Sequence, residues 1–156
     1  MRAVDLLRPE DIVLDPPWRS FQDTVAGLVD VLVRAGSLPA AAAPDAVRAV
    51  LAREREASTA VLDVGVAVPH ARLAGLAAPM IAMAVASRGL YEAVPTVPIR
   101  VVAMVLSPPA ALDDHLRILG GLATLLRSPE LRGELQASGS AERALTALGR
   151  HARSAP

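Results

Sequence analysis

The chain has 156 residues, of which 16 are basic and 16 acidic, so its formal net charge at pH 7 is zero. This balance provides no electrostatic attraction to nucleic acid or to an anionic membrane surface, and we expect neither as a partner. The sequence contains no cysteine and no lysine, which excludes disulfides, thiolate nucleophiles and lysine-based chemistry. Because only 2% of the residues are aromatic, the core of a single domain of this length must consist of Ala, Val and Leu.

The N-terminal stretch MRAVDLLRPEDIVLD is too charged for a signal peptide. The longest nearly apolar stretch, residues 75–87, is interrupted by Pro79 and is shorter than the roughly 18 to 20 residues that a membrane-spanning helix requires. We therefore expect a cytoplasmic protein that does not insert into the membrane.

The first third of the chain predicts two helices. Pro16 and Pro17 stop any preceding element, Ser20 is suited to cap a helix, and apolar residues recur after it at helical spacing. Gly36 suits the end of this helix, and Pro44 opens a second one.

Three short apolar runs in the middle of the chain predict strands. They are rich in Val, Ile and Ala and almost continuously apolar, which is typical of strands covered on both faces. These runs are Val61–Val68, Met80–Ala86 and Ile99–Leu106.

The last third is predicted to be helical again. One helix carries a leucine stripe, and we interpret Asp113 as its N-cap. The stripe consists of Leu112, Leu116, Leu119, Leu122, Ala123 and Leu126. Ser128 caps a further helix, and Ser140 starts a final helix that Gly149 closes. Helices on both sides of a buried sheet indicate an α/β fold in one domain, residues 1–150, with a flexible tail at residues 151–156.

Two of the three histidines lie where α/β domains usually place their sites. His70 follows Pro69 at the end of an apolar run, and His115 lies in the first turn of the helix after the strand Ile99–Leu106. If the two strands are parallel neighbours, these imidazoles face each other across one rim. His151 lies in the tail, and we expect no specific role for it.

Such a pair is suited to phosphoryl chemistry. A neutral imidazole is a nucleophile near neutral pH, and the dianionic product requires hydrogen-bond donors nearby. The N-terminus of a helix supplies such donors and disfavours an extra proton on His115. By position, Arg53, Arg55 and Arg72 are candidates to bind the phosphate.

Simpler interpretations remain open at this point. His70 could merely begin a loop, and His115 could cap or pack its helix. Asp113 and Asp114 beside His115 are a poor metal cluster, because adjacent ligands point in different directions, and we expect no metal. The stretch REREAST, residues 53–59, could be a solvated helix end.

Beyond these residues, the sequence resembles a family. Arg53-Glu54, Ser58-Thr59 and the stretch Gly65–His70 (GVAVPH) are similar to the signature of the enzyme IIA (EIIA) type 2 domain, the fructose, mannitol and nitrogen-regulatory branch of the bacterial sugar phosphotransferase system (PTS). The similarity continues in residues 5–15 and in residues 113–135, so it extends over nearly the whole chain.

This resemblance implies a fold and a mechanism. The fold would be a mixed, mostly parallel five-stranded sheet with helices on both faces. His70 would accept a phosphoryl group from phospho-HPr and pass it to a cysteine of an EIIB protein or domain, and His115 would help to hold the phosphate. Arg53, with Ser58, Thr59 and Arg72, would support it, and no cofactor is required. The partners would come from other chains.

Two departures from the family pattern leave alternatives open. The stretch Ala60–Gly65 is one residue longer than the usual Gly-x-Gly turn and keeps only its last glycine, and residues 90–100 lack the usual acidic, glycine-bearing turn. Instead of sugar uptake, the chain could therefore be a nitrogen-regulatory type EIIA, whose phosphorylation switches its binding to regulatory protein targets, or a degenerate binding module.

Overall fold

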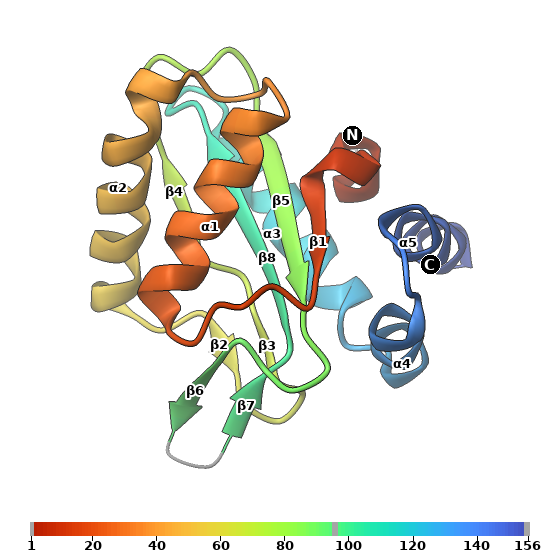
Figure 1. The fold of residues 1–156 in the computed structure, drawn as a ribbon. Helices are drawn as coiled ribbons and strands as arrows, with labels where there is room; N and C mark the ends of the chain where they lie inside the picture. The colour runs from red at the N-terminus through yellow and green to blue at the C-terminus, as the bar shows by residue number, and fades with distance from the viewer. Residues whose placement is uncertain (1, 95–96, 155–156) are drawn as a thin grey trace.

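The computed structural model describes residues 2–94 and 97–154, and a mixed sheet forms its centre (Figure 1). The strand order is β1 (Ile12–Leu14), β5 (Met80–Val85), β8 (Val101–Ser107), β3 (Val66–Ala67) and β2 (Ala60–Val61), and β4 (His70–Arg72) also pairs with β8. The pairs β1–β5, β3–β8 and β4–β8 are parallel, whereas β5–β8 and β2–β3 are antiparallel. The predicted mixed sheet is therefore confirmed.

The strands β3 and β4 are two parts of one interrupted strand. Val66 pairs with Val101 and His70 pairs with Val105, so the register along β8 is the same before and after Pro69. Proline has no N–H to donate, and it breaks the ladder only locally. The six strands of the sheet thus occupy the five positions that the family resemblance implies.

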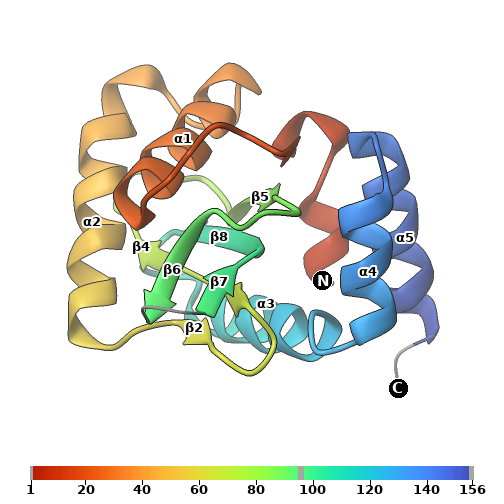
Figure 2. The same ribbon diagram turned by 60° about the horizontal axis from the view of Figure 1, so that its bottom comes forward.

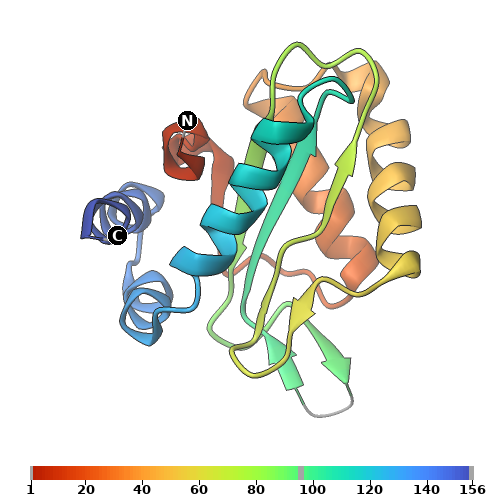
Figure 3. The ribbon, with the colours of Figure 1, turned by 180° about the vertical axis from the view of Figure 1, so that it is seen from behind.

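Helices cover both faces of this sheet. The helices α1 (Phe21–Arg34) and α2 (Ala43–Glu56) lie on one face, whereas α3 (Leu112–Leu125) lies on the other (Figures 1 and 3). The helices α4 (Pro129–Ala137) and α5 (Ala141–Ser154) lie side by side, as Figure 2 shows, and α5 packs against the 3-10 helix η1 (Ala3–Leu6). Two further 3-10 turns are η2 (Pro9–Asp11) and η3 (Ala40–Ala42).

The central position of β8 explains why the sequence of this strand is continuously apolar. Its residues alternate between two cores, because successive strand side chains point to opposite faces. Val101, Ala103 and Val105 pack with α3, α4 and α5, whereas Val102, Met104 and Leu106 pack with α1 and α2. All six are completely buried. The strand is therefore covered on both faces, as its composition predicts.

Two of the three predicted strand runs divide differently in the structure. The run Val61–Val68 is not one strand, since it turns back between β2 and β3 at Gly65, whose φ of 67° suits glycine. A Cβ at Gly65 would also lie 2.9 Å from the carbonyl oxygen of Pro98, so the one retained glycine is the one that this turn needs. Ile99 belongs to β7 (Val97–Ile99), which pairs with β6 (Tyr91–Val94) in a separate two-stranded sheet that was not predicted.

Helix ends were predicted well, with two exceptions. The hydroxyls of Ser20 and Ser128 accept hydrogen bonds from the backbone N–H groups of Asp23 and Leu131, as expected for N-caps. Asp113 is not an N-cap: the turn from Pro108 to Ala111 starts α3 earlier, and Ala111 occupies the cap position.

The final helix does not close at Gly149. It continues to Ser154, and the side chains of Arg150 and His151 both contact Glu134 of α4. Residues 151–154, which were expected to form a flexible tail with residues 155–156, are therefore helical, and those last two residues lie outside the described part of the chain. No helix within residues 2–94 and 97–154 combines the length and the apolar character that spanning a bilayer requires.

Candidate functional site

The sequence had suggested that His70 follows the end of a strand. In the structure it is instead the first residue of β4. Its backbone pairs in register with Val105, and its half-buried ring lies with Nδ1 2.8 Å from the carbonyl oxygen of Val68. A carbonyl oxygen only accepts hydrogen bonds, so Nδ1 must carry the proton and donate it. The other nitrogen, Nε2, therefore keeps its lone pair and is the nucleophilic atom of this ring.

His115 lies beside it, as the topology argument predicted. The two rings are arranged edge to face, with centroids 5.3 Å apart and planes inclined by 63°. His115 belongs to the first turn of α3 and is only 5% exposed. Its Nδ1 lies 2.8 Å from the hydroxyl oxygen of Ser107, the last residue of β8, so Nε2 is the ring nitrogen left for other partners.

Both rings line an open hollow of about 820 Å³, here called the histidine hollow. Arg53 and Arg72 line it as well, so two of the three candidate arginines meet the histidines. Arg55, on the same helix as Arg53, is not among the lining residues. The hollow is lined by Ala49, Ala52, Arg53, Glu56, His70, Ala71, Arg72, Pro109, Leu112, His115, Leu116 and Leu119.

Ser58 and Thr59 do not line the histidine hollow. Thr59 donates from its backbone N–H and from its hydroxyl to the carboxylate of Glu54, each at 2.9 Å, and the hydroxyl of Ser58 donates to the same carboxylate at 3.4 Å. Arg53 donates to the carbonyl oxygen of Ala57 at 3.2 Å. The Ser-Thr pair thus holds the chain where it leaves α2, the helix that carries Arg53.

The surroundings of His115 favour the neutral form of its ring. Burial lowers its pKa below the ordinary value of 6.5, and repulsion from His70 when that ring is protonated, and from Arg72 and Arg53, lowers it further. The direction agrees with the sequence argument from the helix N-terminus, although burial is the main cause. A neutral ring has one N–H to donate and one lone pair.

Sequence reasoning missed two features of this site. Ser107 was not singled out, although it is the one hydroxyl residue that ends the otherwise apolar strand β8. Leu112 and Leu116 were assigned only to a stripe on one helix face, but their exposed fractions are 46% and 58%, and both lie at the histidine hollow. Their i, i+4 spacing is consistent with either interpretation, since it shows only that they share a helix face.

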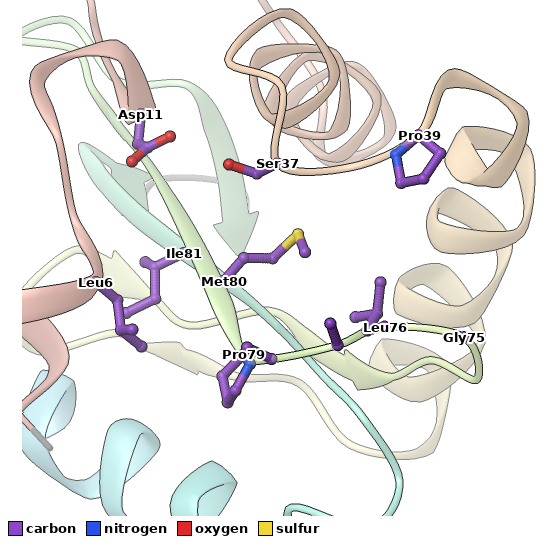
Figure 4. Close-up of a pocket in the computed structure, with 11 residues that line it drawn as sticks. Leu6, Asp11, Ser37, Pro39, Gly75, Leu76, Pro79, Met80 and Ile81 are labelled. Carbon is purple, nitrogen blue, oxygen red and sulfur yellow. The ribbon is translucent and has the colours of Figure 1, made fainter.

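A second hollow, of about 380 Å³, shares no residue with the histidine hollow (Figure 4). Met80, Leu76 and Ile81 make it largely apolar. Its carboxylate, Asp11, already accepts hydrogen bonds from the backbone and the guanidinium of Arg8 at 2.9 and 3.3 Å. Among the described residues, no histidine or arginine lines this second hollow.

No metal centre is formed by the described residues. Within residues 2–94 and 97–154, no three or more His, Asp or Glu side chains gather closely enough to bind an ion, and this includes Asp113 and Asp114.

Comparison with known sequences gives one family. The model of the family described as "Phosphoenolpyruvate-dependent sugar phosphotransferase system, EIIA 2" matches residues 5–150. The fructose-specific EIIA component of the PTS of Haloferax volcanii is 33% identical over 127 residues, which are 81% of this chain and 80% of that protein. The fructose-specific EIIABC component of Bacillus subtilis is 30% identical over 97% of this chain, but the chain spans only 24% of that protein.

Comparison with solved structures gives the same fold. The nitrogen regulatory protein IIA-Ntr of Neisseria meningitidis matches with a TM-score of 0.80 and 28% identity, over 93% of this chain and 97% of that one. The mannitol enzyme IIA of Escherichia coli, solved in complex with phosphorylated enzyme IIB, matches with a TM-score of 0.72 and 19% identity, over 92% of this chain and 97% of that one. At the latter identity, the likeness shows the fold alone.

Proposed function

Because the chain belongs to the EIIA 2 family of the phosphoenolpyruvate-dependent sugar phosphotransferase system, we propose that it is a phosphohistidine carrier. His70 accepts a phosphoryl group from phospho-HPr and passes it to a cysteine of an EIIB protein during sugar uptake. One observation supports this best: the Val68 carbonyl oxygen accepts the Nδ1 proton of His70 and leaves Nε2 as a nucleophile beside a second imidazole.

The chemistry proposed for His70 is a direct displacement in both directions. The lone pair of Nε2 forms a bond to phosphorus while the bond from phosphorus to the donor atom breaks, and that electron pair returns to the donor. In the second step, the cysteine thiolate of EIIB attacks phosphorus and the electron pair of the N–P bond returns to Nε2. The proton on Nδ1 stays at the Val68 carbonyl throughout, so His70 requires no other base.

The two arginines of the histidine hollow favour the phosphorylated state. A phosphoryl group on His70 adds negative charge, and Arg53 and Arg72 line the same hollow. A neutral His115 with a proton on Nε2 would add a further donor. Such transfer depends mainly on positioning and charge stabilisation, because the reaction itself requires little covalent chemistry from the protein.

The rim of the hollow is suited to protein partners. Leu112 and Leu116 are large apolar side chains that remain exposed within reach of the histidines. We propose that HPr and EIIB cover these leucines during transfer, because exposed apolar side chains beside a polar site are typical of protein contacts. The solved complex of the E. coli mannitol enzyme IIA with phosphorylated enzyme IIB provides a precedent for the second partner.

Mass spectrometry tests this proposal. Treatment with phospho-HPr should add about 80 Da to the protein in an acid-labile form. His70→Ala should abolish the gain, whereas His151→Ala, which changes the histidine of α5 at Glu134, should keep it. If His70→Ala is still phosphorylated, or the unchanged protein is not, the carrier role is wrong and a degenerate binding module becomes the better explanation.

A regulatory role is the second candidate, because both the sequence comparison and the structure comparison include nitrogen regulatory proteins. The Neisseria structure is a nitrogen regulatory protein, as is a Pseudomonas aeruginosa relative that is 27% identical over 91% of this chain. Adding EIIB proteins to the isolated phosphoprotein distinguishes the two roles. Rapid loss of phosphate from His70 to a cysteine supports transport, whereas a stable phosphoprotein in the presence of every EIIB tested supports regulation.

A further inference from the structure

Ser107 is a polar residue in an apolar place. It ends β8, is completely buried, and pairs in register with Arg72 of β4. Within the described part of the chain, its hydroxyl has one hydrogen-bond partner, the Nδ1 of His115 at 2.8 Å. Burying a hydroxyl group costs free energy unless the group is hydrogen-bonded. The hydrogen bond to His115 is therefore what offsets the burial of the Ser107 hydroxyl.

The direction of this hydrogen bond determines the tautomer of His115. If Nδ1 donated to the serine oxygen, the hydroxyl proton of Ser107 would be left buried without an acceptor, and Nε2 would carry a lone pair. If the hydroxyl donates to Nδ1, the serine is satisfied and the ring proton lies on Nε2. The second arrangement leaves no buried donor unpaired, and it is the favoured one.

We propose that Ser107 is a positioning residue that holds neutral His115 in its Nε2–H tautomer. The two imidazoles are then complementary: His70 offers the lone pair of its Nε2, and His115 offers an N–H for an oxygen of the transferred phosphoryl group. The use of this N–H rests on the proposed function of His70, whereas the tautomer itself does not.

The charges that face His115 agree with a neutral ring. His70 and Arg72 face it from β4 and Arg53 from α2, and together with burial they lower its pKa. An imidazolium would donate from both nitrogens, and no tautomer would have to be chosen. A neutral ring does need a partner to decide which nitrogen carries the proton, and Ser107 is placed to be that partner.

A pair of variants of equal shape isolates the hydroxyl. Ser107→Thr keeps it and Ser107→Val removes it, and both branched side chains suit a strand. Nitrogen-15 NMR of the unphosphorylated protein reports the tautomer directly. We expect a pyridine-like Nδ1 and a pyrrole-like Nε2 for His115 in the unchanged protein and in Ser107→Thr, and a mixed or reversed tautomer in Ser107→Val.

Two results would overturn the inference. One is a pyrrole-like Nδ1 of His115 in the unchanged protein, which needs no variant to fold. The other is an unaltered tautomer in Ser107→Val.

The phosphorylated protein provides the functional measurement. The lifetime of phosphohistidine on His70 should be roughly two- to tenfold shorter in Ser107→Val than in Ser107→Thr, because a hydrogen bond to a charged group is weakened. Equal lifetimes would remove the positioning role. If His70 of the unchanged protein accepted no phosphate, the carrier proposal would fail, while the NMR spectra would still decide the tautomer.

Discussion

The imidazole of His70 meets that of His115 edge to face, with ring centroids 5.3 Å apart. The first ring comes from β4 and the second from α3, and β8 connects them: it pairs in parallel with β4 and leads through a short turn into α3. The two rings therefore meet because one strand is the neighbour of both elements. The predictions for Arg53 and His115 follow from this arrangement.

Arg53 should matter for phosphorylation and Arg55 should not. Both lie in the last turn of α2, but only Arg53 lines the histidine hollow. We expect Arg53→Ala to shorten the lifetime of phosphohistidine roughly tenfold, the low end for a hydrogen bond to a charged group. Arg55→Ala is the matched control and should leave it unchanged. Equal effects of the two variants, measured by the decay of the added mass, would contradict this role.

His115 should stabilise the phosphorylated state by donating from Nε2. We expect His115→Ala to shorten the lifetime of the phosphate on His70 by roughly ten- to a hundredfold, since it removes a hydrogen bond to a charged group. His115→Gln retains an N–H donor and should lose less. The measurement is again the decay of the added mass, and an unaltered lifetime in His115→Ala would exclude the supporting role.

His115 should also make the stability of the protein depend on pH. Burial lowers its pKa below 6.5, together with repulsion from Arg72, from Arg53 and from His70 when that ring is protonated. As the pH falls through the ordinary value, the unfolded chain therefore binds a proton that the folded protein does not, and the free energy of unfolding decreases.

Urea unfolding at about pH 7.5 and at about pH 5.5 measures this loss, which should be smaller in His115→Gln. Carboxylates whose pKa values are lowered, such as Asp5 and Glu134, lose their contribution at lower pH and are common to both proteins. The same loss in both proteins would show that His115 is not its source.

Gly27 of α1 should resist replacement although it lies in a helix. A Cβ at this position would overlap the indole ring of Trp18, which packs directly on the helix backbone. We expect Gly27→Ala to destabilise the protein by about 1–3 kcal/mol, because overpacking outweighs the better helix propensity of alanine. Gly133→Ala in α4 is the control: nothing lies within 4 Å of its added Cβ, and it should stabilise by roughly 0.5–1 kcal/mol.

Urea unfolding, followed by the fluorescence of Trp18, the one tryptophan of the chain, measures both variants. A Gly27→Ala protein that is more stable than the unchanged one would show that the indole moves away at little cost.

Several elements could be predicted because their signals are local. Ser20 and Ser128 cap their helices with their own hydroxyls, so the cap and the helix start lie within a few residues. The run Met80–Ala86 became β5 with only its last residue left out, since it is apolar on both faces. The predicted α/β class and the predicted family are also confirmed. So are the helices on both faces of the sheet (Figures 1 and 3).

Other features could not be read from local patterns. The run Val61–Val68 gives no sign that Gly65 lies against Pro98, which is the contact that favours glycine at this turn. Thr59 matches the family signature, but its bonds to Glu54 depend on how the chain leaves α2. Likewise, helical spacing alone cannot tell that Leu116 faces outward at the histidine hollow.

The amino-acid sequence by itself determined the type of most elements, the α/β class, the family and the two histidines of the proposed site, because periodicity, caps and motifs act over a few neighbouring residues. Only the tertiary structure decided that Arg53 and Arg72 join His70 and His115, that Ser58 and Thr59 do not, and that Ser107 binds the second imidazole. The physical reason is the pairing of β4 with β8: which side chains converge depends on which distant strands share hydrogen bonds, and no local pattern encodes that choice.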